Sequence, residues 1–141
     1  MPNTMSHIGV CVSDLDRSLR FYCDGLGFQP AVEYQVGSEF GDALEVEGDV
    51  KLTSKMITHG TFMIELLDYE TPGVTGAPST SRGQLGITHI SLYVDDIDAM
   101  IERLVEHGGT YLPSTRTAND EIDLGFVTDP DGTRVELMQQ K

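Results

Sequence analysis

The chain contains an internal repeat that aligns without a gap. Residues 7–16 match residues 89–98, so that each residue of the second copy stands 82 positions after its counterpart, as His89 stands after His7. The same offset aligns Gly27 with Gly109, and residues 64–67 resemble residues 135–138. A duplication of this kind predicts two copies of one supersecondary unit.

Each copy is predicted to begin with a strand and a helix. Apolar residues alternate over 7–12 and again over 89–94, which is the period of a half-buried strand. Asp14 and Asp95 or Asp96 suit helix N-caps, and glycines follow the apolar periodic stretches. The apolar face expected for the second helix consists of Ile97, Met100, Ile101, Leu104 and Val105.

Short β-rich runs follow each helix and complete the predicted modules. They cover residues 31–36, 43–46, 51–58 and 61–67 in the first half and 111–116, 123–128 and 134–138 in the second. We therefore predict an α+β fold of two βαβββ modules, whose curved mixed sheets form a cavity with the helices outside. The 141 residues would make one domain, with module one over about 5–70, a linker over about 71–86 and module two over about 87–140.

Charge and composition exclude several classes of partner. Twenty-three acidic residues against nine basic ones give a net charge of −14, which repels nucleic acid and anionic membranes. No stretch is apolar over the ~18 residues that a membrane span needs, and the start lacks a secretory signal pattern. Two cysteines are too few for a disulfide scaffold. We expect a cytoplasmic protein without nucleic-acid or membrane partners.

Strand parity places two histidines and two glutamates opposite the predicted apolar faces. His7 and His89 stand at the start of equivalent strands, and Glu65 and Glu136 alternate with apolar residues in later ones. A single histidine or glutamate on a strand more often has a structural role than a metal-binding one. Here both residue types recur at equivalent positions of the repeat, which favours a set of metal ligands. Two imidazoles and two carboxylates suit one divalent ion per site, Ni, Zn, Co, Mn or Fe, with a position left for substrate.

These motifs resemble the vicinal oxygen chelate superfamily, which includes glyoxalase I, methylmalonyl-CoA epimerase, extradiol dioxygenases and the fosfomycin- and bleomycin-resistance proteins. The resemblance is carried by residues 7–10, 14–18 and 21–22, then by 89–90 and 94–97, and by 129–132 leading to 135–137. It covers essentially the whole chain. The four-ligand pattern favours the glyoxalase I-like or methylmalonyl-CoA epimerase-like branch.

The resemblance implies a metal held by His7, Glu65, His89 and Glu136 and an enzyme that is a homodimer. The expected function is that of a lyase or isomerase that transfers a proton on a small substrate chelated through vicinal oxygens. Glu136 is the expected general base, and Glu65 a second acid/base or a plain ligand.

Three alternatives remain open. An iron-dependent extradiol-type dioxygenase would use His7, His89 and Glu136 and leave Glu65 unexplained. A metal-free resistance protein would sequester a ligand in the same cavity, and a thiol transferase acting on fosfomycin is a further possibility.

Four more residues are candidates for contact with the substrate. Arg134 shares a face with Glu136 at about 7 Å along the strand and suits an anionic group, or else a surface ion pair. Met63, Tyr93 and Met138 share the predicted ligand face and suit the apolar wall of a cavity, although they also suit a core or a subunit interface.

Overall fold

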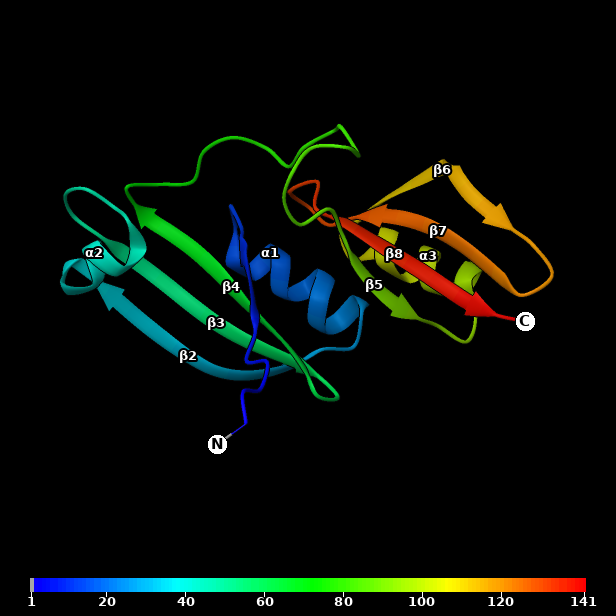
Figure 1. Cartoon of the computed structure of the whole chain (residues 1–141), viewed down its shortest axis with the longest axis horizontal. Helices are drawn as coiled ribbons and strands as arrows, with labels where there is room; N and C mark the ends of the chain where they lie inside the picture. Colours follow the sequence, from blue (N-terminus) through cyan, green and yellow to red (C-terminus); the bar gives the residue numbers. More distant parts are fainter. Residues whose placement is uncertain (1) are drawn as a thin grey trace. The chain divides into compact units, whose positions relative to one another are not determined.

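The computed structural model describes residues 2–141, which form two compact units. The first unit contains the described residues up to Asp16 together with Gly27–Thr75, and the second contains Arg17–Leu26 together with Gly76–Lys141. Each unit has a four-stranded sheet in which the first strand pairs in parallel with the last, while the remaining pairs are antiparallel. Figure 1 shows these two sheets, with the first strand of each lying along the last.

The first unit carries the sheet with strand order β1-β4-β3-β2. Its elements are β1 (Ile8–Cys11), β2 (Gln29–Gly37), the 3-10 turn η2 (Ser38–Phe40), α2 (Gly41–Leu44), β3 (Lys51–His59) and β4 (Phe62–Thr71). Ile64 and Leu66 of β4 are fully buried, and they alternate with half-buried Met63, Glu65 and Leu67. One face of the strand therefore belongs to the core, and Glu65 lies on the other.

The second unit repeats this arrangement in the order β5-β8-β7-β6. Its elements are η1 (Arg20–Gly25), β5 (Ile90–Tyr93), α3 (Ile97–Glu106), β6 (Thr110–Ala118), β7 (Ile122–Thr128) and β8 (Arg134–Gln140), and α1 (Leu15–Leu19) precedes η1 across the boundary between the units. Val135 and Leu137 of β8 are fully buried, whereas Arg134, Glu136 and Met138 are half-buried. The alternation again leaves the glutamate opposite the core.

The predicted α+β fold with two βαβββ repeats is confirmed, apart from one predicted strand. Residues 43–46 were expected to be extended, but the structure has the short helix α2 and a left-handed Glu45 at φ 56°. The amide of Val46 donates to the Gly41 carbonyl at 3.0 Å, which closes a helical turn. The alternation of apolar Leu44 and Val46 with acidic residues therefore belongs to a helical turn and not to a strand.

Helix α3 confirms the predicted cap but not the whole predicted face. The Asp96 side chain accepts a hydrogen bond from the Ala99 amide at 3.0 Å, which selects it over Asp95 as the N-cap. Ile97, Ile101 and Leu104 are buried, but Val105 is 48% exposed. The stripe facing the sheet is narrow, at i, i+4 and i+7, so Val105 falls outside it.

The segment 17–26 packs within the second unit, although it follows the first strand of the chain. Phe21 and Tyr22 are fully buried, and the Tyr22 hydroxyl donates to Asp129 at 2.9 Å. The Arg17 guanidinium pairs with Asp131, and Arg103 of α3 donates to the Asp24 carbonyl. Burial raises the pKa of Asp129, while the hydrogen bond from Tyr22 acts against that rise. These contacts join the segment to α3 and to the turn before β8.

Gly109, which lies between α3 and β6, is too closely surrounded for a larger residue. A Cβ there would lie 2.7 Å from the Phe21 ring, 2.9 Å from the Leu104 carbonyl oxygen and 2.9 Å from Val127. We expect Gly109→Ala to lower the free energy of unfolding by about 1–3 kcal/mol, because the extra methyl overpacks this contact. Denaturant unfolding measures the loss. The matched control is Gly83→Ala, whose Cβ would meet nothing within 4 Å; equal stability of the two variants would contradict the packing described.

Candidate functional site

A histidine and a glutamate form a close pair on the first sheet. His7 directly precedes β1, and Glu65 lies on β4, the parallel partner of β1. His7 Nε2 is 3.1 Å from Glu65 Oε2, and the side chains are 33% and 20% exposed. The buried hydroxyl of Ser54 on β3 donates to the other oxygen, Oε1, at 2.6 Å. The Glu65 carboxylate is therefore held from two sides.

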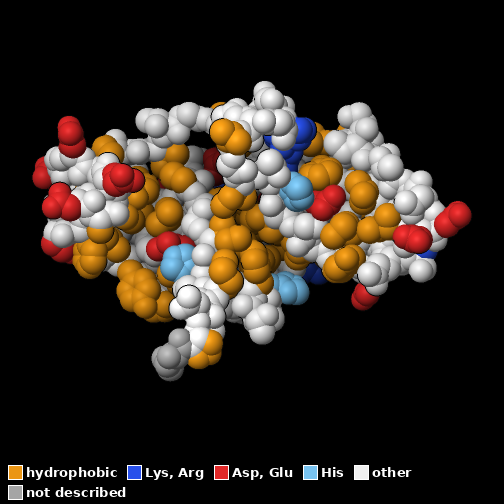
Figure 2. Space-filling model, in the orientation of Figure 1, with side chains coloured by type: hydrophobic (Ala, Val, Ile, Leu, Met, Phe, Trp, Pro, Cys, Tyr) orange, Lys and Arg blue, Asp and Glu red, His pale blue; other side chains and the backbone are white. Residues whose placement is uncertain are grey.

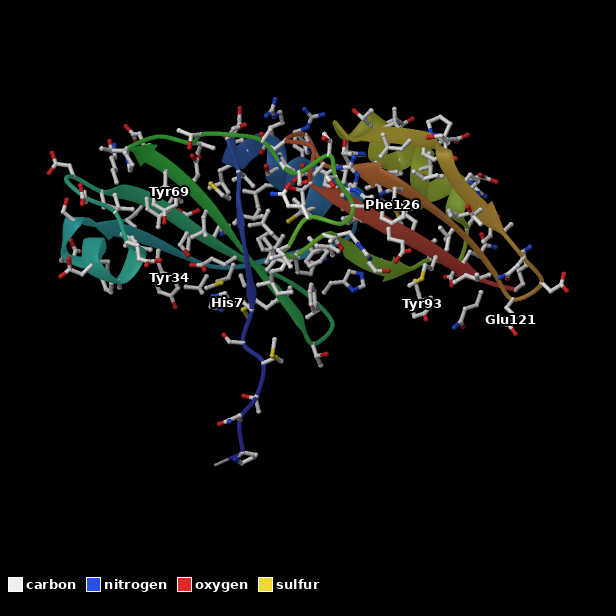
Figure 3. All side chains as sticks on the ribbon, turned by 45° about the horizontal axis from the view of Figure 1, so that its top comes forward. His7, Tyr34, Tyr69, Tyr93, Glu121 and Phe126 are labelled. Carbon is white, nitrogen blue, oxygen red and sulfur yellow. The ribbon has the colours of Figure 1, made fainter. Side chains whose placement is uncertain are left out.

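The second sheet carries the equivalent pair. His89 directly precedes β5, and Glu136 lies on its parallel partner β8. His89 Nε2 is 3.5 Å from Glu136 Oε2, which also accepts a hydrogen bond from Ser91 at 2.8 Å. The Phe126 ring of β7, labelled in Figure 3, contacts the His89 ring edge-on with centroids 5.4 Å apart. On the face seen in Figure 2, histidine lies beside acidic side chains in both parts of the molecule.

Both histidines are oriented in the same way by the residue before them. The Nδ1 atom of His7 lies 2.8 Å from the Ser6 hydroxyl, and that of His89 lies 2.8 Å from the Thr88 hydroxyl. When Nδ1 carries the proton and donates it to the hydroxyl, Nε2 presents a lone pair toward the glutamate. Metal-binding histidines are commonly oriented by such a second hydrogen bond.

Neither glutamate has a strongly basic partner. Among residues 2–141, the ion pairs within 4.0 Å of Glu65 and Glu136 are those with His7 and His89. Carboxylates that are only 20% and 17% exposed are costly to leave charged without compensation. A bound cation would compensate their charge.

The donor set fits a divalent metal ion. Two donors bound to one ion at about 2.1 Å and at right angles lie about 3.0 Å apart, which is close to the His7–Glu65 separation of 3.1 Å. Imidazole nitrogen and carboxylate oxygen are ligands that Zn, Ni, Co, Mn and ferrous iron accept. The structure brings the predicted ligands together as two pairs, and no group of three or more potential ligands occurs among the residues that it describes.

The four predicted substrate contacts lie on the faces expected. Arg134 shares the β8 face of Glu136 and donates to the Ser79 carbonyl at 3.1 Å, with no carboxylate partner among the described residues. Met138 is paired with Tyr93 in the sheet. Tyr93 is 67% exposed. It lines a cavity of about 320 Å³ together with Val94, Asp95 and Gln140. Met63 is half-buried beside Glu65 on β4.

Several residues that support the pairs were missed in the sequence. Extending the repeat by one residue would have found Ser6 and Thr88, which are also 82 positions apart. Ser54 has no such signal. Met56 pairs with Glu65 as Phe126 pairs with Glu136, so the counterpart of Ser54 in the second half is Leu124, which has no hydroxyl. The role of Ser54 depends on strand register, which the sequence does not reveal.

Comparison with known proteins identifies the family. A family model described as the Glyoxalase/Bleomycin resistance protein/Dioxygenase superfamily matches residues 4–137. The chain belongs to this superfamily. Among its relatives, the uncharacterized protein YaeR of Escherichia coli is 31% identical over 95% of this chain and 94% of its own. A probable lactoylglutathione lyase of Synechocystis is 28% identical, covering 94% of this chain and 92% of its own.

A solved structure supports the fold of this superfamily member. A glyoxalase family protein from Bacillus cereus superposes with a TM-score of 0.84 at 22% identity, covering 96% of this chain and 93% of that one. Superfamily membership and the lyase name of a relative together support a glyoxalase-like or related function. No helix among residues 2–141 has the length and apolar character needed to cross a membrane.

Proposed function

We propose that this superfamily member is a metal-dependent lyase or isomerase that moves a proton on a small substrate with two vicinal oxygens, in the manner of glyoxalase I. The observation that carries the proposal is the repeated His–Glu pair, in which each imidazole Nε2 faces a poorly exposed carboxylate that has no Lys or Arg partner among the described residues. His7, Glu65, His89 and Glu136 would hold one divalent ion. A homodimer is the assembly that the family resemblance implies.

The two pairs are needed together because two protein donors leave a divalent ion weakly held, whereas catalytic sites of this kind use three or more protein ligands. The ion would supply Lewis-acid stabilisation of the negative charge that develops on two neighbouring substrate oxygens. Each pair supplies one imidazole nitrogen and one carboxylate oxygen, so the two pairs supply matching donors.

Glu136 is the proposed general base. Both His89 and Ser91 contact its Oε2 atom, while no described residue donates to Oε1. Oε1 is thus available to accept a proton from a carbon next to a carbonyl. Glu65 differs, because Ser54 donates to its Oε1 at 2.6 Å. This restraint suits a ligand, or an acid that returns the proton after the base has removed it.

The dioxygenase alternative receives less support from the same contacts. It would use one glutamate, yet Glu65 and Glu136 are equally placed on the fourth strands and each faces its own histidine. Iron as the retained metal, with oxygen consumption, would restore that alternative. A protein that binds no metal would act by ligand sequestration.

Metal content tests the ligand set. We expect the purified chain to hold about one divalent ion, because one ion uses all four donors. His7→Ala and His89→Ala should each abolish stoichiometric metal, measured by elemental mass spectrometry after dialysis against Ni, Zn, Co, Mn or ferrous iron. His107→Ala, a histidine at the end of α3, is the control and should retain the metal. Two ions per chain, or loss in only one of the two ligand variants, would show that the pairs do not serve a common ion.

Proton exchange tests the role of Glu136. The metal-loaded chain should speed exchange of the methylene protons of hydroxyacetone with D2O, followed by NMR, and lactoylglutathione is a second probe. Glu136→Gln should reduce the rate by about 10²–10⁴-fold at saturating metal, because the general base is lost. Glu121→Gln removes an equal charge in the turn between β6 and β7 and should leave the rate unchanged. A metal-loaded Glu136→Gln protein with full exchange activity would overturn the assignment.

A further inference from the structure

Two arginines converge on one backbone carbonyl in the second unit. Arg134, at the start of β8, donates from Nη1 to the Ser79 carbonyl at 3.1 Å, and Arg82 donates from Nη2 to the same oxygen. Figure 2 shows basic side chains gathered on the visible face beside a histidine. One carbonyl oxygen therefore has two positively charged neighbours.

These two guanidinium groups have no acidic partner within 4.0 Å among the described residues. Arg17 and Arg116 do form ion pairs, with Asp131 and with Asp98 and Asp123, whereas Arg20 and Arg103 also have none among residues 2–141. Arg82 and Arg134 differ from these in sharing one acceptor. Two like charges that share an uncharged acceptor repel each other, and an anion between them would remove that repulsion.

The loop that carries Arg82 is held against the start of β8. Pro78 lies 3.8 Å from the position of a Cβ on Gly132, in the turn before β8, and Ser79 accepts from Arg134. Within the loop, the Ser79 hydroxyl donates to Gln84 at 2.7 Å and accepts from the Ser81 amide at 3.1 Å. These contacts keep Arg82 near Arg134.

Arg134 lies on the same strand face as the proposed base. Arg134 and Glu136 are both half-buried and alternate with buried Val135, so about 7 Å of strand separates them. A ligand with one end at Glu136 can therefore present its other end to the arginines. Guanidinium groups bind carboxylates and phosphates through paired hydrogen bonds.

We propose that Arg82 and Arg134 form a binding site for an anionic oxygen group, carboxylate or phosphate, carried by the substrate. The inference rests on the proposed function for the reacting end of the substrate. It adds that this substrate is an anion, whose charged group lies beyond the carbons that carry the vicinal oxygens. The positive charge of the two guanidinium groups attracts the anion locally, against the repulsion from the net charge of −14.

The test uses the metal-free full-length chain and two probes, inorganic phosphate and succinate, with uncharged succinamide for comparison. Titrations followed by NMR of the arginine Nε–H groups should show saturable binding of one or both anions and none of succinamide. Arg134→Gln and Arg82→Gln should each weaken binding by about tenfold or more. Arg103→Gln is the matched control, because Arg103 also donates to a single backbone carbonyl, that of Asp24.

The outcomes separate this inference from the proposed function. Saturable anion binding that falls in both variants but not in Arg103→Gln supports the site, and the tighter probe identifies phosphate or carboxylate. Absence of saturable binding, or equal weakening in Arg103→Gln, overturns it. If the Arg134 variant does not fold by circular dichroism, exposed Arg82 provides the same test. The titrations use the metal-free chain, so their result does not depend on whether the proposed metal site is correct.

Discussion

The parallel pairing of the first and last strand in each unit is the constraint on which the site depends. Gly9 is the Cα partner of Glu65, and Ser91 is the Cα partner of Glu136. This register brings the histidine that precedes each first strand to the glutamate of its partner. A slip of one residue would turn the glutamate into the core and a buried aliphatic residue toward the histidine. The buried alternation in β4 and β8 opposes such a slip, so the core specifies the site.

Much of the architecture was predictable because the duplication supplied each expectation twice. The two βαβββ repeats and the parity of both glutamates were predicted and are confirmed. Of the two predicted cap candidates, Asp95 and Asp96, the structure selects Asp96. Local patterns gave wrong predictions in two places. The apolar alternation at residues 43–46 predicted a strand where the structure has a helical turn. The apolar residues of α3 predicted a wider buried face than the helix has, because Val105 is exposed. The packing of Phe21 and Tyr22 within the second unit depends on long-range contacts, which periodicity does not encode.

The supporting shell was the least predictable part of the site. Ser54 reaches Glu65 from the antiparallel neighbour, while Ser91 reaches Glu136 from the parallel one. The repeat therefore preserves the histidine and glutamate but not the hydroxyl that orients the carboxylate. This difference leaves Oε1 of Glu136 without a donor among the described residues and gives Oε1 of Glu65 a short hydrogen bond. Two chemically identical residues can thus be assigned different roles from their hydrogen bonds.

X-ray absorption spectroscopy of the metal-loaded protein tests the central claim most directly, because it reports the ligands of the ion itself. The account predicts about two imidazoles per ion, with the remaining shell made of oxygen donors at about 2.0–2.2 Å for zinc. A wild-type spectrum with one imidazole or none would contradict the assignment of His7 and His89 to a common metal centre.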